Sequence, residues 1–472
     1  MLTLADMIEA LCGTRPPEAQ TVITLAVIDS REAIPGALFV AVPGQQVDGH
    51  DYVGNAFQNG ANLALIEHPI ATDYPVLDFR GDFDAQALAA LEFPFCILVE
   101  NTLTALQTVA HFYRRKMDVR VVGITGSVGK STTKELVAEV LGQRYPTLKS
   151  PGNLNNEIGL PLIMLQLTHG HERAVLEMGF YVPGEIEFLC DIALPQVGVV
   201  TNVGLVHAER AGSQEVIAQG KAELVRALPA DGVAILNYDD EWVRGMAEQT
   251  QAQVLFYGLD PQADLWADEI EGLGLEGIRF SLHYQGETLH LKVPMLGQHS
   301  VHTVLRAAAV GLVEGLDWGE ILSGLRFGQT QLRLVAVRAV SGALLLDDTY
   351  NASPQSTLAA LNLLHELDGR KVAVLGDMLE LGQYERQGHE MVGYRCAEVA
   401  DELITIGARA RTIAETARSA GMPASKITEM DSPDEATALL RTHLSENDVV
   451  LVKGSLGMQM RDIVPSLEAQ EA

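Results

Sequence analysis

Cysteine, basic side chains and long apolar runs are all scarce in this 472-residue sequence. Its four cysteines lie far apart and form no CxxC pair, which excludes a disulfide framework and a structural zinc site. No apolar run approaches the roughly 18 residues of a membrane-spanning helix, and the N-terminus lacks the charged and apolar regions of a signal peptide. We therefore expect a cytoplasmic protein without a membrane span.

Acidic side chains outnumber basic ones, with 62 Asp and Glu against 33 Lys and Arg, for a formal charge of −29. Duplex nucleic acid and anionic membranes are bound through a surplus of Lys and Arg, so neither is an expected partner. An anionic ligand must instead bind at a local positive site. Hydrophobic residues make up 47% of the chain, enough for packed cores. One core rarely exceeds roughly 250–300 residues, so the length predicts two or three domains.

Changes in the sequence pattern divide the chain into three predicted α/β domains, 1–112, 113–326 and 327–472. The first is a small mixed α/β domain with a helix at 4–12. Its short β-rich runs lie at 22–25, 38–42, 63–66 and 96–99. From residue 119 strands and helices alternate, which predicts a central parallel-sheet domain like a P-loop ATPase, with an antiparallel hairpin at 282–293. The alternation restarts after residue 327 and predicts a Rossmann-like C-terminal domain.

The strongest local signal is the segment 123–132, Gly-Ile-Thr-Gly-Ser-Val-Gly-Lys-Ser-Thr, between a predicted strand and a predicted helix. Backbone N–H groups of such a turn and helix N-terminus can hold phosphate oxygens. Lys130 would add positive charge at the β- and γ-phosphates, and the Ser131 hydroxyl would reach Mg²⁺. The pattern departs from a strict Walker A sequence at Ile124, where glycine is usual. The predicted phosphate-binding residues are Gly126, Ser127, Gly129, Lys130, Ser131 and Thr132.

Three further groups each leave two interpretations open. Asn153, Asn155 and Asn156 either build a turn or bind a polar ligand. Glu177, His207 and Lys221 follow predicted central strands, whose carboxyl ends converge on one crevice, and could complete a Mg²⁺ site. Taken singly, each has a purely structural explanation, as a capping Glu, a satisfied core His and a solvated Lys. The segment 347–354 either binds ribose or a cation, or caps a helix. Lys453 is a weak candidate anion contact.

Together, and in this order along the chain, these motifs resemble the Mur ligase family over nearly the whole sequence. The motifs that carry the resemblance are Asp29-Ser30-Arg31, the run from Pro35 to Asp51, the loop Gly126–Ser131, Gly152–Asn156, Asp347–Ala352, Leu375–Gly382 and Val452–Ser455 with Met458. Gly152–Asn156 and Asp347–Ala352 point to the family member that adds the terminal D-alanyl-D-alanine dipeptide to the peptidoglycan precursor.

The resemblance implies a role for each candidate residue. The expected UDP-substrate residues are Ser30, Arg31, Gly49 and His50 in the first domain. The expected Mg²⁺ ligands are Ser131, Glu177, His207 and Lys221, the last as a carbamylated lysine that supplies an anionic oxygen. Lys130, Lys221, His207 and Arg333 are the expected catalytic residues, with Arg333 near the γ-phosphate. His299 and Asp348 would bind the nucleotide, Asp348 through the ribose. Asn153, Asn155, Asn156, Tyr350 and Asn351 would contact the acceptor substrates.

Two segments depart from the family pattern. The family has GxHNxxN where the adenine of ATP binds, but here Ser300 and Thr303 replace both amides after His299. The segment 208–213, after the expected metal ligand His207, is altered as well.

The implied reaction is ATP-dependent amide formation through an acyl phosphate, with UDP-N-acetylmuramoyl-tripeptide, D-alanyl-D-alanine and ATP as substrates and Mg²⁺ as cofactor. We expect a monomer. A ligase of the same family with another substrate, such as the one adding the third stem residue or glutamate to folate, is the nearest alternative. An NTP-driven switch or nucleic-acid motor is the more distant one. The sequence does not identify the third stem residue.

Overall fold

The computed structural model describes residues 1–44, 47–70, 73–81, 88, 91–204, 209, 212–327 and 335–469. It divides into two compact units, the first made of residues 1–123, 145–179 and 185–196 and the second of the remaining residues. These units cut across the predicted central domain, so the limits 1–112, 113–326 and 327–472 stay a prediction. No helix of the described residues combines the length and apolar character needed to cross a membrane.

A five-stranded parallel sheet opens the first unit, with the strand order β1-β2-β3-β5-β4. The strands are β1 (Ala26–Val27), β2 (Leu38–Val40), β3 (Leu63–Ile66), β4 (Val76–Asp78) and β5 (Phe95–Leu98). The helices are α1 (Leu4–Cys12), α2 (Val53–Gln58) and α4 (Thr102–Arg115). The helix predicted at 4–12 is confirmed, because Thr3 and Asp6 form a capping box and Gly13 ends the helix at a φ of 69°.

The strand predicted at 22–25 is wrong. Val22 makes one isolated bridge with Thr3, and pairing with β2 begins at Ala26, opposite Leu38. Residues 22–27 form one continuous β-prone run, so the partner strand decides which of them enters the sheet.

A nine-stranded sheet has the order β14-β13-β12-β11-β10-β9-β6-β8-β7. Its strands are β6 (Arg120–Thr125), β7 (Thr147–Lys149), β8 (Arg173–Glu177), β9 (Val197–Val200), β10 (Val233–Asn237), β11 (Gln253–Gly258), β12 (Leu265–Gly272), β13 (Ile278–Tyr284) and β14 (Glu287–Val293). The accompanying helices are α5 (Lys130–Leu141), α6 (Gly159–Met164), α7 (Glu185–Ala193), α9 (Gln214–Arg226), α10 (Glu241–Arg244), α11 (Val301–Val313) and α12 (Trp318–Phe327). The strands from β9 to β12 pair in parallel, and β13 and β14 form the predicted antiparallel hairpin.

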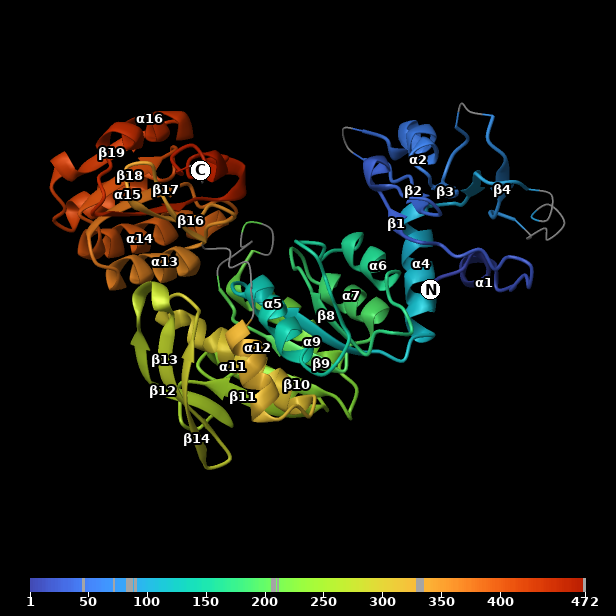
Figure 1. Ribbon diagram of the computed structural model, residues 1–472, viewed down its shortest axis with the longest axis horizontal. Coiled ribbons are helices and arrows are strands. Elements are labelled where there is room, and N and C mark those ends of the chain that lie inside the picture. The colour runs from blue at the N-terminus through green and yellow to red at the C-terminus, as the bar shows by residue number, and fades with distance from the viewer. Residues whose placement is uncertain are drawn as a thin grey trace. The chain divides into compact units, whose positions relative to one another are not determined.

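The C-terminal sheet belongs to the second unit and has the order β15-β16-β20-β17-β18-β19. Its strands are β15 (Val335–Arg338), β16 (Leu344–Asp348), β17 (Arg370–Gly376), β18 (Glu402–Ile406), β19 (Ile427–Met430) and β20 (Asp448–Lys453). Its helices are α13 (Pro354–Glu366), α14 (Glu385–Val399), α15 (Arg411–Ser419) and α16 (Pro433–His443), drawn in orange and red in Figure 1. Only β15 runs antiparallel to its neighbour, so the Rossmann-like prediction for this region is confirmed.

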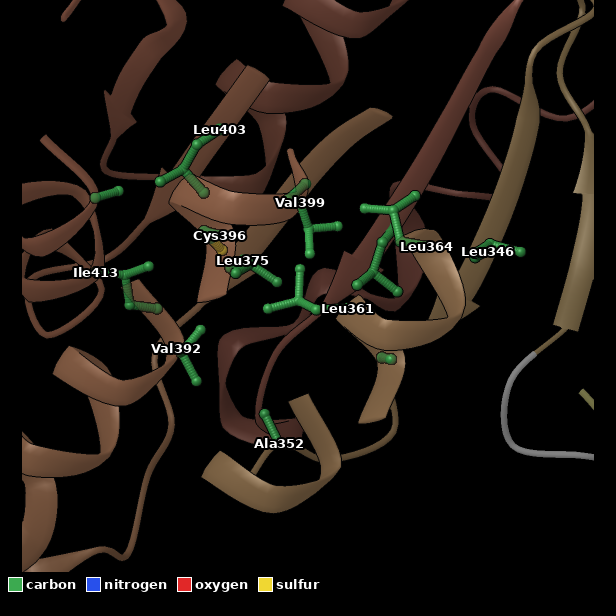
Figure 2. Close-up of a cluster of buried hydrophobic side chains, with 14 of the residues drawn as sticks. Leu346, Ala352, Leu361, Leu364, Leu375, Val392, Cys396, Val399, Leu403 and Ile413 are labelled. Carbon is green, nitrogen blue, oxygen red and sulfur yellow. The ribbon is translucent and has the colours of Figure 1, made fainter. Parts of the chain in front are cut away.

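Apolar side chains from α13, α14 and β17 form the core on one face of this sheet, as Figure 2 shows for Leu361, Leu375 and Val392. All three are buried. Because this core holds the sheet and its helices together, it fixes where β16 and β20 end, and the polar residues Asp348 and Lys453 stand at those ends.

Candidate functional site

A cavity of about 390 Å³ lies in the second unit, where four polar segments meet. Its walls are the glycine-rich loop before α5, the residues that follow β9, the start of α11, and the segment between β16 and α13 together with Lys453. The predicted phosphate loop and the predicted ribose-binding segment therefore line one cavity.

The glycine-rich loop has the strand–loop–helix context that its sequence predicts. Strand β6 is buried and ends at Thr125, and α5 begins at Lys130. Gly126 and Gly129 have φ values of 144° and 85°, which L side chains rarely adopt. A Cβ atom at Gly126 would also collide with the hydroxyl of Thr201. The helix thus starts directly at the loop, where backbone N–H groups and the helix dipole favour an anion.

The residues after β9 hold this loop in place, a role that the sequence analysis did not predict. The Asn202 side chain accepts a hydrogen bond from the Val128 N–H at 2.9 Å and donates one to the Val128 carbonyl at 3.0 Å. Thr201 donates to the same carbonyl at 2.7 Å, and Ser127 Oγ accepts from the Gly204 N–H at 2.8 Å. The sequence signal that could have indicated this role is the pair of polar residues directly after a buried strand.

Lys130 and Lys221 are the two predicted catalytic residues that the structure describes. Lys130 Nζ donates to the Gly126 carbonyl at 2.8 Å, so its ammonium group stays at the loop. Lys221 lies on α9 and is buried, with Nζ 5.1 Å from the centre of the Phe180 ring. Burial, followed by the positive charge of Lys130, lowers the pKa of Lys221 well below its usual value. No carboxylate pairs with Lys221 among the described residues.

His207 and Arg333 lie outside the described residues, so their predicted roles stay predictions. The same holds for residues 208, 210 and 211 of the altered segment.

Glu177 is hydrogen-bonded to the Asn-rich loop, residues 152–156, in the first unit. Asn155 Nδ2 donates to Glu177 Oε1 at 2.9 Å, and Glu177 is buried at the end of β8. Asn156 Oδ1 accepts from the Gly159 N–H at 2.9 Å at the start of α6, so this amide builds the turn. Asn153 is exposed. The structure shows this local role for Asn156, and the roles of Asn153, Asn155 and Asn156 toward a substrate stay predictions.

The start of α11 forms one wall of the cavity and contains Ser300 and Thr303, which replace the two amides of the family motif after His299. Ser300 Oγ donates to the Leu296 carbonyl at 2.7 Å, and Thr303 Oγ1 accepts from Arg306 Nη2 at 2.8 Å. His299 lines the cavity. Burial of the ring among the cavity walls, followed by the nearby positive groups, lowers the pKa of His299 below its usual value, so this ring is neutral at pH 7. Arg306 was not predicted.

The opposite wall carries an ion pair between two strand ends. Lys453 Nζ donates to Asp348 Oδ2 at 2.6 Å and to the Asn351 carbonyl at 2.8 Å. The ammonium is buried, whereas Asp348 keeps some exposure to the cavity. Tyr350 is exposed. Ser353 caps α13, so the capping interpretation is confirmed for this residue.

The predicted UDP-substrate residues lie in the first unit. Arg31 is exposed and donates through Nη2 to Asp29 at 2.6 Å, which lowers the pKa of Asp29 to about 2. Ser30 is buried, and its carbonyl accepts from Asn59.

His50 and Gly49 have internal packing roles in the same unit. His50 is buried, contacts Asp48 through Nδ1 at 2.6 Å and accepts the Glu67 N–H at Nε2 at 2.9 Å. Gly49 approaches the backbone of Val42 too closely for a Cβ atom. Both ring nitrogens of His50 are thus engaged within the protein, which suits a positioning role for this residue.

Three models of one family match successive parts of the chain. "Mur ligase family, catalytic domain" matches residues 22–113, "Mur ligase middle domain" matches 124–311, and "Mur ligase, glutamate ligase domain" matches 332–456.

Relatives resemble the chain over nearly its full length. The UDP-N-acetylmuramoyl-tripeptide–D-alanyl-D-alanine ligase of Bacillus subtilis is 34% identical, with 98% of both chains covered. The Escherichia coli ligase of the same name is 31% identical, with 99% of this chain and 98% of that one covered. A crystal structure of MurF from Acinetobacter baumannii has a TM-score of 0.83 at 30% identity, with 97% of both chains covered. The Thermotoga maritima MurF ligase in complex with ADP has a TM-score of 0.77 at 28% identity, with 94% of this chain and 96% of that one covered.

Proposed function

Because this chain belongs to the Mur ligase family, we propose that it joins D-alanyl-D-alanine to UDP-N-acetylmuramoyl-tripeptide at the expense of ATP. The observation that carries the proposal is the cavity in which the glycine-rich loop and the Asp348–Lys453 wall come together. Similarity over nearly the whole chain to ligases of this name supports the choice of substrates.

The nucleotide would occupy this cavity with its phosphates at the loop. Lys130 and the N-terminus of α5 offset the phosphate charge at the loop. Because the protein has a net charge of −29, it needs such a local positive site to bind an anionic ligand. The Asp348 carboxylate accepts hydrogen bonds from the ribose hydroxyl groups, and Lys453 holds this carboxylate in place. Arg333 is assigned to the γ-phosphate.

Mg²⁺ is the expected cofactor, and the available donors suit it. The Ser131 hydroxyl and the Glu177 carboxylate are oxygen donors of the kind that Mg²⁺ prefers. We assign His207 and carbamylated Lys221 to the same site. Lys221 is buried without a carboxylate partner among the described residues, and its lowered pKa favours the neutral amine that CO₂ requires. When bound, Mg²⁺ would neutralise phosphate charge.

The reaction would then run in two steps. The substrate carboxylate attacks the γ-phosphorus and forms an acyl phosphate, and ADP leaves. The amine of D-alanyl-D-alanine attacks the acyl carbon, and the tetrahedral intermediate expels phosphate as the amine loses its proton. Positioning and charge neutralisation are the protein's main contributions, and exclusion of water protects the acyl phosphate.

The UDP part of the substrate is assigned to the first domain through Ser30 and Arg31, with Gly49 and His50 holding the adjoining turn. Asn153, Asn155, Asn156, Tyr350 and Asn351 are assigned to the acceptor substrates. We propose a cytoplasmic monomer.

Phosphate release measured with all three substrates, and with each omitted in turn, tests the function. We expect release only when UDP-tripeptide, D-alanyl-D-alanine and ATP are all present. Turnover without the dipeptide would favour an NTP-driven switch. Turnover with another amino acid and not with the dipeptide would favour a different ligase of the family.

A further inference from the structure

The segment 180–184, between β8 and α7, packs against α9 beside Lys221. Both parts belong to the second unit. The Phe180 and Lys221 side chains are buried, and Lys221 Nζ lies over the Phe180 ring, 5.1 Å from its centre. Among the described residues, no carboxylate pairs with this amine. The aromatic ring is thus the neighbour that limits where the Lys221 side chain can lie.

Gly220 makes room for this ring on the helix. A Cβ atom at Gly220 would overlap the Phe180 ring, so the ring packs directly on the helix backbone at the position before Lys221. Gly220 stands in the interior of α9, where glycine is less favourable than alanine. The close approach of the ring therefore requires a residue that the helix by itself disfavours.

The other end of the segment is fixed to the same helix. The Gly184 N–H donates to Glu223 Oε1 at 2.7 Å, and Glu223 is buried. Gly184 has a φ of 92°, in the left-handed region that favours glycine. The segment 180–184 thus contacts α9 at residues 220 and 223, on both sides of Lys221 in the sequence. Two attachments to one helix leave the Phe180 ring little freedom to turn away.

We propose that Phe180 is a positioning residue for Lys221, because its ring, packed on Gly220, holds the Lys221 amine in the orientation in which CO₂ adds to it. This inference rests on the proposed function, which assigns a carbamylated Lys221. In that step the amine lone pair attacks the carbon of CO₂ and forms an N–C bond. One C–O π bond opens to an oxyanion, and a proton leaves the nitrogen for solvent.

The expected effect of the ring is on how readily the carbamate forms. A lysine side chain has many rotamers, and ordering it costs conformational entropy. A ring that already restricts the side chain removes part of that cost from the carbamylation step. The protein should therefore hold its carbamate at a lower bicarbonate concentration than it would without the ring.

The test measures the carbamate on the full-length protein by ¹³C NMR in ¹³C-bicarbonate, with Mg²⁺ and ADP present, and the ligation rate over a range of bicarbonate concentrations. The carbamate signal is assigned through its loss in Lys221→Ala. Phe180→Ala should raise the bicarbonate concentration at half-maximal signal, and at half-maximal ligation, by about tenfold, a part of the rotamer freedom that an ordered lysine loses. The KM values for ATP and the UDP-substrate, measured at saturating bicarbonate, should stay within about twofold of wild type.

Two further variants separate the packing from other effects. Phe180→Leu keeps the apolar bulk and removes the attraction of the ring for an ammonium group, so its bicarbonate dependence should stay within about threefold of wild type. Gly220→Ala displaces the ring from the helix side and should act in the same direction as Phe180→Ala. Alanine favours the helix at this position, so a loss in Gly220→Ala does not come from the helix itself.

Phe188→Ala is the matched control, because Phe188 is an exposed phenylalanine on α7, and it should leave the bicarbonate dependence unchanged. Wild-type bicarbonate dependence in folded Phe180→Ala and Gly220→Ala would overturn the proposal. A lower kcat in these variants with an unchanged carbamate signal would overturn it too, since Phe180 would then not act on Lys221.

The wild type alone distinguishes this inference from the proposed function. Full ligation without a carbamate signal would overturn the role given to Phe180 and leave the ligase reaction standing. A wild type that carries the carbamate and does not join the dipeptide would count against the proposed function alone, because the carbamate signals of the variants still decide the role of Phe180.

Discussion

Replacing Lys453 by Met removes the charge that holds Asp348 at the cavity wall while keeping most of the side-chain volume. The Lys453 ammonium donates at 2.6 Å to Asp348 and at 2.8 Å to the Asn351 carbonyl, and the two charged side chains are 2% and 15% exposed. Breaking a buried ion pair by removing one partner costs about 3–5 kcal/mol. Because Asp348 keeps some contact with solvent, we expect a loss near the lower limit, about 3 kcal/mol.

Calorimetric unfolding of the full chain measures this loss. For a region of this size, a change of about 3 kcal/mol corresponds to a drop of roughly 6–12 °C in the transition of the C-terminal sheet. Lys426→Met is the control, because Lys426 is exposed and its replacement should change stability by less than about 0.5 kcal/mol. The KM for ATP should rise in Lys453→Met and stay unchanged in Lys426→Met. Equal transition temperatures for the two variants would refute the role given to the buried pair.

Three further predictions concern the other proposed sites. Lys130→Ala should lower kcat by several orders of magnitude with an unchanged unfolding temperature, and ligation within tenfold of wild type would show that the loop does not bind the reacting phosphates. Lys221→Ala should nearly abolish ligation, with partial rescue by short carboxylates. Removing bicarbonate should lower the ligation activity of the wild type and leave that of Lys221→Ala unchanged. The loss in the wild type should grow as the pH falls through the lowered pKa of Lys221, because protonation removes the neutral amine that CO₂ needs. Arg31→Ala should raise the KM for the UDP-substrate and leave that for ATP nearly unchanged; equal effects on both would contradict a separate uridine site.

The family, the fold class and the phosphate loop's surroundings could be predicted because their signals are local. A buried run, closely spaced glycines and a helical pattern predict a strand, a turn and a helix from neighbouring residues alone. The alternation of strands and helices likewise predicted the parallel sheets.

Pairing between distant segments could not be predicted in the same way. The run 22–27 is β-prone throughout, and only β2 decides that Ala26 and Val27 are its strand residues. Asn202 is an ordinary polar residue in the sequence. Its role comes from the loop that the fold brings beside it, which local patterns do not reveal.

Some predicted site residues turn out to have internal partners. His50 was predicted to contact the UDP-substrate, and its two ring nitrogens are engaged by Asp48 and the Glu67 N–H. Asn156 builds the start of α6. A sequence motif marks residues that a family keeps in one arrangement, and it does not separate those that touch a substrate from those that position its neighbours.

The fate of the carboxylate oxygen tests the proposed ligation most directly. UDP-tripeptide labelled with ¹⁸O in the reacting carboxylate is incubated with ATP, D-alanyl-D-alanine and the protein, and the released phosphate is analysed by mass spectrometry. An acyl phosphate requires one carboxylate oxygen to leave with each phosphate, so the phosphate should carry one ¹⁸O atom for each amide bond formed. Unlabelled phosphate released alongside the amide product would contradict the acyl-phosphate route.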